Sequence, residues 1–313
     1  MSRSVRLGLV NLLMQSETLA ARRQRLLSLV DEAGRAGCQI VLLPEFADHH
    51  GTLEAAQAGP GGPAQTRQVV GLAPDAPWLR QLAERAQQYR LVVIPDVLLC
   101  EGERATNAAL VIGPDGTLLG RYAKTHLAPG ENRLVAAGDT IDTIATPYGR
   151  LGLLICWDIH FAELTRVHEL QGADLLLWST MRQVEHEDML WRAVLPARCW
   201  EHSLPLAVST YVSVHQQPLR RPMAATLFNA FGQVVAGGAT TEGVVVGTVD
   251  LDERPRDRRY WGQPDWVDAG AYYRRYRRPD LYGPLTRPLS AEEREPDGAA
   301  AVAHYPELTS PLI

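Results

Sequence analysis

The chain has 313 residues, of which 46% are hydrophobic and 21% are charged, as in an ordinary soluble globular protein with a large core. A formal net charge of −5 argues against a general nucleic-acid binder, whose affinity depends on neutralising phosphates. No stretch reaches the roughly 18 apolar residues that a membrane span needs, so we expect no membrane partner.

The four cysteines are Cys38, Cys100, Cys156 and Cys199. They form no CxxC pair and show no metal-ligand spacing, which favours a reducing, cytoplasmic location. The neighbouring His49 and His50 lack a third ligand at a usable spacing, so we expect no metal.

The N-terminal part of the chain shows alternating strand and helix patterns. In chain order it predicts a strand at 5–11, a helix at 17–37, a strand at 40–44, a helix at 76–89 and a strand at 91–99. The first of these, with arginine interrupting a short apolar run, is a strand rather than a signal peptide.

Hairpins interrupt this alternation further along the chain. The middle part predicts a hairpin at 107–124 with a Pro-Asp-Gly turn, a strand at 148–156, a helix at 161–173 and a strand at 174–179. The last part predicts a helix at 187–202 kinked by Pro196, a strand at 204–210, a hairpin at 224–238 and a strand at 243–251.

This mixture predicts an α/β fold with two packed mixed β-sheets and helices outside. We place a single domain at residues 1–252 and an extended C-terminal tail at 253–313. The tail carries nine arginines and five tyrosines between Arg254 and Pro288. Arginine and tyrosine are enriched at interface cores, so we expect the tail to pack on the domain or on a neighbouring subunit.

Three reactive side chains follow predicted strands. Glu45 ends "VLLPE", Lys124 ends "GRYAK" and Cys156 ends "LLIC". Ligand sites in α/β proteins gather at the carboxyl ends of strands, where loops are free and the scaffold is rigid. We therefore expect these three side chains to converge on one pocket.

In these sequence contexts the chain resembles the nitrilase superfamily of carbon–nitrogen hydrolases over roughly residues 5–250. The resemblance rests on "LLPEF", "GRYAKTHLAPGE" and "GLLICWDIHFAEL", in that order. It implies an αββα sandwich, no metal or cofactor, and a homodimer or a larger homo-oligomer. It also implies an enzyme of class EC 3.5 that cleaves a non-peptide C–N bond of a small molecule through a cysteine thioester, releasing ammonia or an amine.

The resemblance implies a role for each motif residue. Cys156 is the expected nucleophile, and Glu45 is the base that takes its proton. Lys124 stabilises the oxyanion together with the backbone N–H of Trp157. Glu131 matches a second glutamate that positions the lysine and the substrate.

Residues around these motifs bear on the substrate. Asp158 stands where nitrilases usually have glutamate, which favours a small amide or N-carbamoyl substrate over a nitrile. Arg182 could bind a substrate carboxylate, and Trp178 and Trp191 could line an apolar pocket. We expect His126 to support the site through hydrogen bonds.

Several alternatives stay open at this point. A nitrilase would use the same residues on a nitrile, and an acyltransferase would pass the acyl group to an amine. A cysteine–histidine hydrolase of another fold would use His160 or His202 as its base. A non-enzymatic protein could use the arginine- and tyrosine-rich tail to bind nucleic acid, but acidic residues dilute that segment, so we expect no nucleic-acid partner.

Overall fold

The structure is a computed structural model that describes residues 3–13, 15, 17–49, 62–181, 190–212, 224–239, 241–254, 256–257 and 267–290. Its strands are β1 (Ser4–Leu13), β2 (Ile40–Leu42), β3 (Val92–Ile94), β4 (Asp96–Glu101), β5 (Arg104–Ile112), β6 (Leu118–Ala123), β7 (Ile144–Thr146), β8 (Gly149–Ile155), β9 (Leu175–Ser179), β10 (Leu206–Val212), β11 (Thr226–Phe228), β12 (Val234–Ala236), β13 (Gly243–Asp250), β14 (Arg256–Asp257) and β15 (Val267–Asp268). Its helices are α1 (Leu19–Arg35), α3 (Gly62–Val70), α4 (Pro77–Tyr89), α5 (Ala162–Leu170), α7 (Leu195–His202), α8 (Ala269–Arg275) and α9 (Gly283–Thr286).

The main strands form two halves of one curled sheet. The first half has the order β4-β5-β3-β2-β1, with β6 added to β5 and β13 added to β1. The second half has the order β10-β9-β8-β7, with β11 added to β10 and β12 added to β11. The two halves are joined where Asn11–Leu13 of β1 pair in parallel with Thr210–Val212 of β10.

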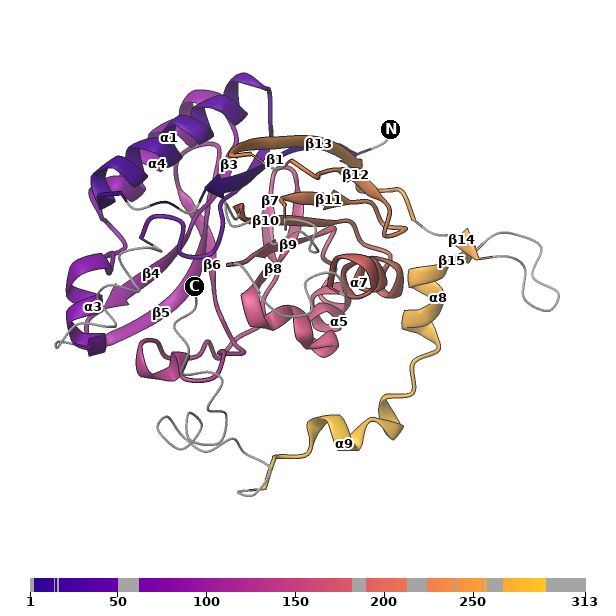
Figure 1. Ribbon diagram of the computed structural model, residues 1–313. Helices are drawn as coiled ribbons and strands as arrows, with labels where there is room; N and C mark the ends of the chain where they lie inside the picture. Colours follow the sequence, from indigo (N-terminus) through magenta and orange to yellow (C-terminus); the bar gives the residue numbers. More distant parts are fainter. Residues whose placement is uncertain are drawn as a thin grey trace, which may run out of the picture.

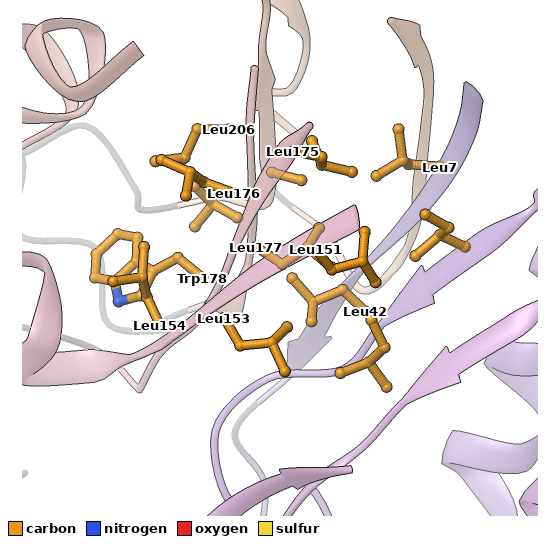
Figure 2. Packing of buried hydrophobic residues seen from close by; sticks show 14 of the residues in the cluster. Leu7, Leu42, Leu151, Leu153, Leu154, Leu175, Leu176, Leu177, Trp178 and Leu206 are labelled. Carbon is orange, nitrogen blue, oxygen red and sulfur yellow. The ribbon is translucent and has the colours of Figure 1, made fainter. Parts of the chain in front are cut away.

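The halves face each other across a buried apolar core. Leu7 and Leu42 from the first half pack in one cluster with Leu153 and Leu177 from the second half, as Figure 2 shows. In Figure 1, α1 and α4 cover the outer side of the first half, and α5 and α7 cover the outer side of the second. The predicted αββα sandwich is therefore confirmed, with the addition that its two sheets are hydrogen-bonded at one edge.

Helix α1 shows how local sequence sets these boundaries. The Thr18 hydroxyl caps its first turn by accepting from the N–H of Ala21, at 3.2 Å. Leu26 and Val30 are fully buried against the sheet, as their four-residue spacing predicts. The chain then turns through Gly37 at φ +71, a conformation that glycine adopts without strain.

Two predicted elements needed correction. The strand expected at 91–99 is divided at Pro95 into β3 and β4, because proline has no N–H to donate to a sheet. The helix expected to be kinked at Pro196 begins with a π-helical segment, Leu190–Val194, and continues as α7. Pro196 is the second residue of α7, directly after the change from π-helix to α-helix.

The described part of the tail leaves the sandwich beside α5. Arg274 of α8 forms an ion pair with Glu169 of α5, and Figure 1 shows α9 further along, away from the sheets. The domain boundary at residue 252 stays a prediction. Among the helices that the structure describes, none combines the length and apolarity needed to cross a bilayer.

Candidate active site

The structure brings the three predicted strand-end residues together. Glu45 lies in a turn just after β2, Lys124 directly follows β6, and Cys156 directly follows β8. The first two come from one half of the sheet and Cys156 from the other. The three side chains converge between the two halves of the sheet, where Glu45 and Lys124 are buried.

The carboxylate of Glu45 is held by donors on both of its oxygens. Oε1 accepts from Nδ2 of Asn107 at 2.8 Å and from Nζ of Lys124 at 3.1 Å. Oε2 accepts from the backbone N–H of Met181 at 2.9 Å. The hydroxyl of Tyr211 donates to the carbonyl of Glu45 at 2.9 Å, which fixes the backbone as well. These donors fix the position of the Glu45 carboxylate.

Lys124 lies between two carboxylates. Its Nζ donates to Oε2 of Glu131 at 2.7 Å as well as to Glu45. Glu131 also accepts from the N–H of Ala128 at 2.9 Å, so its own position is fixed. Burial opposes the charge of Lys124, but the neighbouring Cys156, Glu45 and Glu131 outweigh burial and raise the pKa of Lys124 well above its usual value. Lys124 is therefore a permanently charged ammonium at neutral pH.

Asn107 of β5 closes this group of side chains, and its role was missed at the sequence level. Its Nδ2 donates to both Glu45 and Glu131, at 2.8 and 3.1 Å. Its backbone carbonyl accepts from the N–H of Lys124 at 2.9 Å. An asparagine within an otherwise apolar strand is the signal that could have identified it, because a buried amide needs partners.

Cys156 sits at a strained turn. Its φ is +47, a left-handed conformation that is uncommon for residues other than glycine, and strain of this kind concentrates at functional sites. The thiol hydrogen-bonds the Glu45 side chain. Burial and the negative charge of Glu45 raise the pKa of the thiol, while Lys124 acts in the opposite direction. In the resting site Cys156 is therefore a protonated thiol, and the carboxylate of Glu45 lies next to it.

Two tryptophans flank Cys156. Trp157 follows it in the first turn of the 3₁₀ segment Cys156–His160, where backbone N–H groups have no partner within the helix. Trp178 of β9 donates its indole N–H to the carbonyl of Cys156 at 3.0 Å. The Trp178 side chain is fully buried in the core, so it supports the turn at Cys156 from the core side and does not line an open surface.

A single carboxylate connects the segments that carry Lys124 and Cys156. Asp158 accepts from the N–H of Ile155 and the hydroxyl of Tyr122 through Oδ2, at 2.9 and 2.8 Å. Its Oδ1 accepts from the N–H of His126 at 3.0 Å and lies 3.0 Å from the ring nitrogen Nδ1. The ring of His126 stacks on Phe161 at 3.8 Å. His126 thus takes part in a hydrogen-bonded network with Asp158.

The remaining candidates have other surroundings. Arg182 lies outside the described residues, and so does the side chain of Trp191. Nε2 of His202 lies 2.7 Å from Oγ1 of Thr165, between α5 and α7. Burial, with Arg166 and Arg198 nearby, lowers the pKa of His202 to about 3. A histidine with so low a pKa is a weak proton acceptor, and its ring is engaged with Thr165, which disfavours His202 as the base for Cys156.

Lys124 is the ammonium that pairs with both carboxylates of the site, Glu45 and Glu131. Within the described part of the chain, no three histidine, cysteine, aspartate or glutamate side chains are grouped closely enough to hold a metal ion. His49 instead lies 2.5 Å from Asp48, which is also paired with Arg23. What the arrangement offers is a thiol nucleophile, a carboxylate that can accept its proton, and an ammonium that can stabilise a developing oxyanion.

Comparisons with known proteins agree with this chemistry. Residues 6–259 match the family model for "Carbon-nitrogen hydrolase". A probable nitrilase of Schizosaccharomyces pombe is 30% identical over 71% of this chain and 79% of its own length. The omega-amidase NIT2 of Homo sapiens is 29% identical over 79% of this chain and 89% of its own length.

Solved structures show the same fold. A carbon–nitrogen hydrolase from Helicobacter pylori G27 superposes with a TM-score of 0.72 and 19% identity, covering 92% of this chain and 99% of that one. An amidase from Nesterenkonia sp. superposes with a TM-score of 0.67 and 19% identity, covering 91% of this chain and 97% of that one.

Proposed function

The chain belongs to the carbon–nitrogen hydrolase family, and on that premise we propose that it hydrolyses a small amide or N-carbamoyl compound with Cys156 as its nucleophile. The observation that carries this proposal is the contact of the Cys156 thiol with Glu45, next to the buried ammonium of Lys124. A thiol is mostly protonated at neutral pH, so a base beside it is what makes attack on an amide carbon feasible.

The first half of the reaction forms a thioester. Glu45 takes the proton of the thiol as sulfur attacks the carbonyl carbon. The oxygen then becomes negative and is stabilised by the ammonium of Lys124 and the backbone N–H of Trp157. The tetrahedral intermediate collapses as Glu45 returns the proton to the leaving nitrogen, which departs as ammonia or an amine.

The second half releases the acid. Glu45, again a carboxylate, takes a proton from water as the water oxygen attacks the thioester carbon. The same ammonium and N–H stabilise the second oxyanion, and the proton returns to sulfur as the carboxylic acid leaves. Glu131 and Asn107 keep Lys124 and Glu45 in place through both halves.

The substrate class is supported by relatives and by one residue of the motif. The relatives include proteins named omega-amidases, and one named a probable nitrilase. Asp158 stands where nitrilases usually have glutamate, and this favours an amide or carbamoyl carbon over a nitrile. Arg182 remains the proposed partner of a substrate carboxylate.

We also propose that the protein is a cytoplasmic homodimer or a larger homo-oligomer. All four cysteines are free, which suits a reducing compartment. The tail leaves Tyr276, Leu281 and Leu285 more than half exposed in the single chain. Exposed apolar side chains next to arginines are typical of subunit contacts.

The test is ammonia release from a panel of amides, N-carbamoyl compounds and nitriles, with product analysis in the presence of an added amine. We expect release from amides or carbamoyl compounds and a free acid as the product. Release from nitriles alone would overturn the proposed substrate class, and an acyl-amine as the main product would identify an acyltransferase.

A further inference from the structure

A second buried carboxyl group, outside the motif residues, lies at the same junction of the sheet halves. Asp96 is the first residue of β4 and is fully buried. Its Oδ1 accepts from the N–H of Phe46 at 3.3 Å, and its Oδ2 lies 2.7 Å from the hydroxyl of Ser179. None of the assigned steps uses Asp96.

These two contacts reach both sides of the active site. Phe46 follows the base Glu45 and has the left-handed φ of +47, so its backbone direction sets where Glu45 points. Ser179 ends β9 in the second half of the sheet and pairs in register with Ile155, the residue before Cys156. Asp96 therefore links the half that carries the base to the half that carries the nucleophile.

The charges around Asp96 favour its neutral form. The titratable groups that face it are Glu45, Lys124 and Tyr211. The ammonium of Lys124 is already shared by Glu45 and Glu131, so it cannot also neutralise a third buried carboxylate. The hydrogen-bond partners of Asp96, the Phe46 N–H and the Ser179 hydroxyl, are both neutral.

We propose that Asp96 is a positioning residue that acts as a neutral carboxylic acid and, through Phe46 and Ser179, sets the spacing of Glu45 and Cys156. Burial and the charge of Glu45 raise the pKa of Asp96 well above its usual value, which agrees with this role. A neutral Asp96 can hold the segment that carries Glu45 without repelling it, whereas an ionised Asp96 would repel the negative charge that Glu45 must carry.

The protonation state can be tested without any substrate. Because the pKa of Asp96 is higher in the folded protein than in the unfolded chain, unfolding releases a proton. The associated stability is fully present below the unfolded pKa and is lost as the pH rises through the folded pKa. Above about pH 5, where an unfolded aspartate is ionised, the unfolding constant of wild type should rise with pH more steeply than that of Asp96→Asn, by up to about tenfold per pH unit.

Asp48→Asn is the matched control for this measurement. Asp48 is also fully buried near Glu45, but His49 and Arg23 lower its pKa, so it is ionised in this range. Asp48→Asn should be less stable than wild type and keep the wild-type slope. Equal slopes of the unfolding constant against pH in wild type and Asp96→Asn would overturn the proposal that Asp96 is a neutral acid.

The positioning role is tested by activity, and this arm rests on the proposed function. Asp96→Asn keeps an oxygen for the Phe46 N–H and an amide group that can hydrogen-bond the Ser179 hydroxyl. Its kcat and KM should therefore stay within about threefold of wild type, and the shape of its pH profile should be unchanged. Asp96→Ala loses both contacts, and kcat should fall about 10- to 100-fold with KM little changed. If Asp96→Ala does not fold, Ser179→Ala cuts one link, and its kcat should fall about five- to tenfold.

The outcomes separate the two proposals. Wild-type kcat in Asp96→Ala, or in Ser179→Ala if the former does not fold, would overturn the positioning role, as would equal losses in Asp96→Asn and Asp96→Ala. If wild type hydrolyses no amide or carbamoyl compound, the proposed function fails, but the unfolding slopes still decide whether Asp96 is a neutral acid.

Discussion

The Nζ atom of Lys124 lies 3.1 Å from Oε1 of Glu45, although 79 positions separate the two residues along the chain. Their side chains are 1% and 2% exposed. Charges buried this deeply are tolerated only when they are paired and hydrogen-bonded, because each has lost its hydration. The pair therefore fixes, in one place, the ammonium and the carboxylate that the proposed chemistry needs.

Replacing Lys124 by methionine should remove the charge while keeping most of the side-chain volume. We expect kcat to fall about 10²- to 10³-fold, because one oxyanion donor is lost. We also expect a loss of about 3–5 kcal/mol in the free energy of unfolding, because Glu45 is left as a buried, unpaired charge. Steady-state kinetics and urea unfolding measure the two effects.

Arg121→Met is the matched control, since Arg121 lies on the same strand, β6, in an exposed ion pair with Glu101. It should change stability by less than about 1 kcal/mol and leave kcat unaltered. A Lys124→Met enzyme that kept more than about a tenth of wild-type kcat would exclude Lys124 as an oxyanion donor.

Replacing Asn107 by aspartate should place a third negative charge between Glu45 and Glu131. The carboxylates would then bind a proton more readily, so the acid limb of the kcat/KM profile should move to higher pH. We expect kcat/KM at neutral pH to fall at least about tenfold. Asn107→Ala, which removes the contacts without adding charge, should lower kcat and move the limb less than Asn107→Asp does; an unshifted limb in Asn107→Asp would count against this arrangement.

Removing the charge of Glu45 should make the Cys156 thiol easier to ionise and, at the same time, slow catalysis. Burial and the charge of Glu45 raise the pKa of Cys156, so Glu45→Gln should lower that pKa even as it removes the base. Turnover should fall at least about 10²-fold at the same time. Thiolate absorbance during a pH titration reports the pKa, with Cys156→Ser as the blank for the other three cysteines. A higher thiol pKa in Glu45→Gln is the result that this electrostatic account forbids.

Asp158 should matter for stability more than any single partner that it binds. Asp158→Asn leaves at least one buried donor among Ile155, Tyr122 and His126 unpaired, at a cost of about 1–3 kcal/mol for each such donor. Tyr122→Phe removes one donor and should cost about 1 kcal/mol. Urea unfolding of both variants measures the difference, and equal losses would show that Asp158 does not join the two segments.

Glu45 and Cys156 could be predicted because each follows an apolar strand. "VLLPE" and "LLIC" place the two residues at the carboxyl ends of strands, where ligand sites in α/β proteins gather. The αββα layers could be predicted from the alternation of strands, helices and hairpins together with the family motifs. Local pattern and global fold agree in these elements.

The supporting residues could not be predicted in the same way. Asn107 lies within a strand, and its contacts depend on how β5 faces Glu45 across the sheet, which no local pattern encodes. Asp96 ends "VVIPD" just as Glu45 ends "VLLPE", so the same signal was present, yet the apolar residues on both sides of Pro95 made the segment resemble one continuous strand. The contact between Asp96 and Ser179 joins the two halves of the sheet, and only the folded chain shows it.

The most direct test of the central claim is the position of the acyl group during turnover. Wild-type enzyme mixed with its best amide substrate is quenched in acid within the first turnovers, digested and analysed by mass spectrometry. We predict an acyl adduct on the peptide that contains Cys156, and no adduct and no ammonia release with a folded Cys156→Ala variant. An adduct on another residue, or turnover by Cys156→Ala above about 5% of the wild-type rate, would contradict the account.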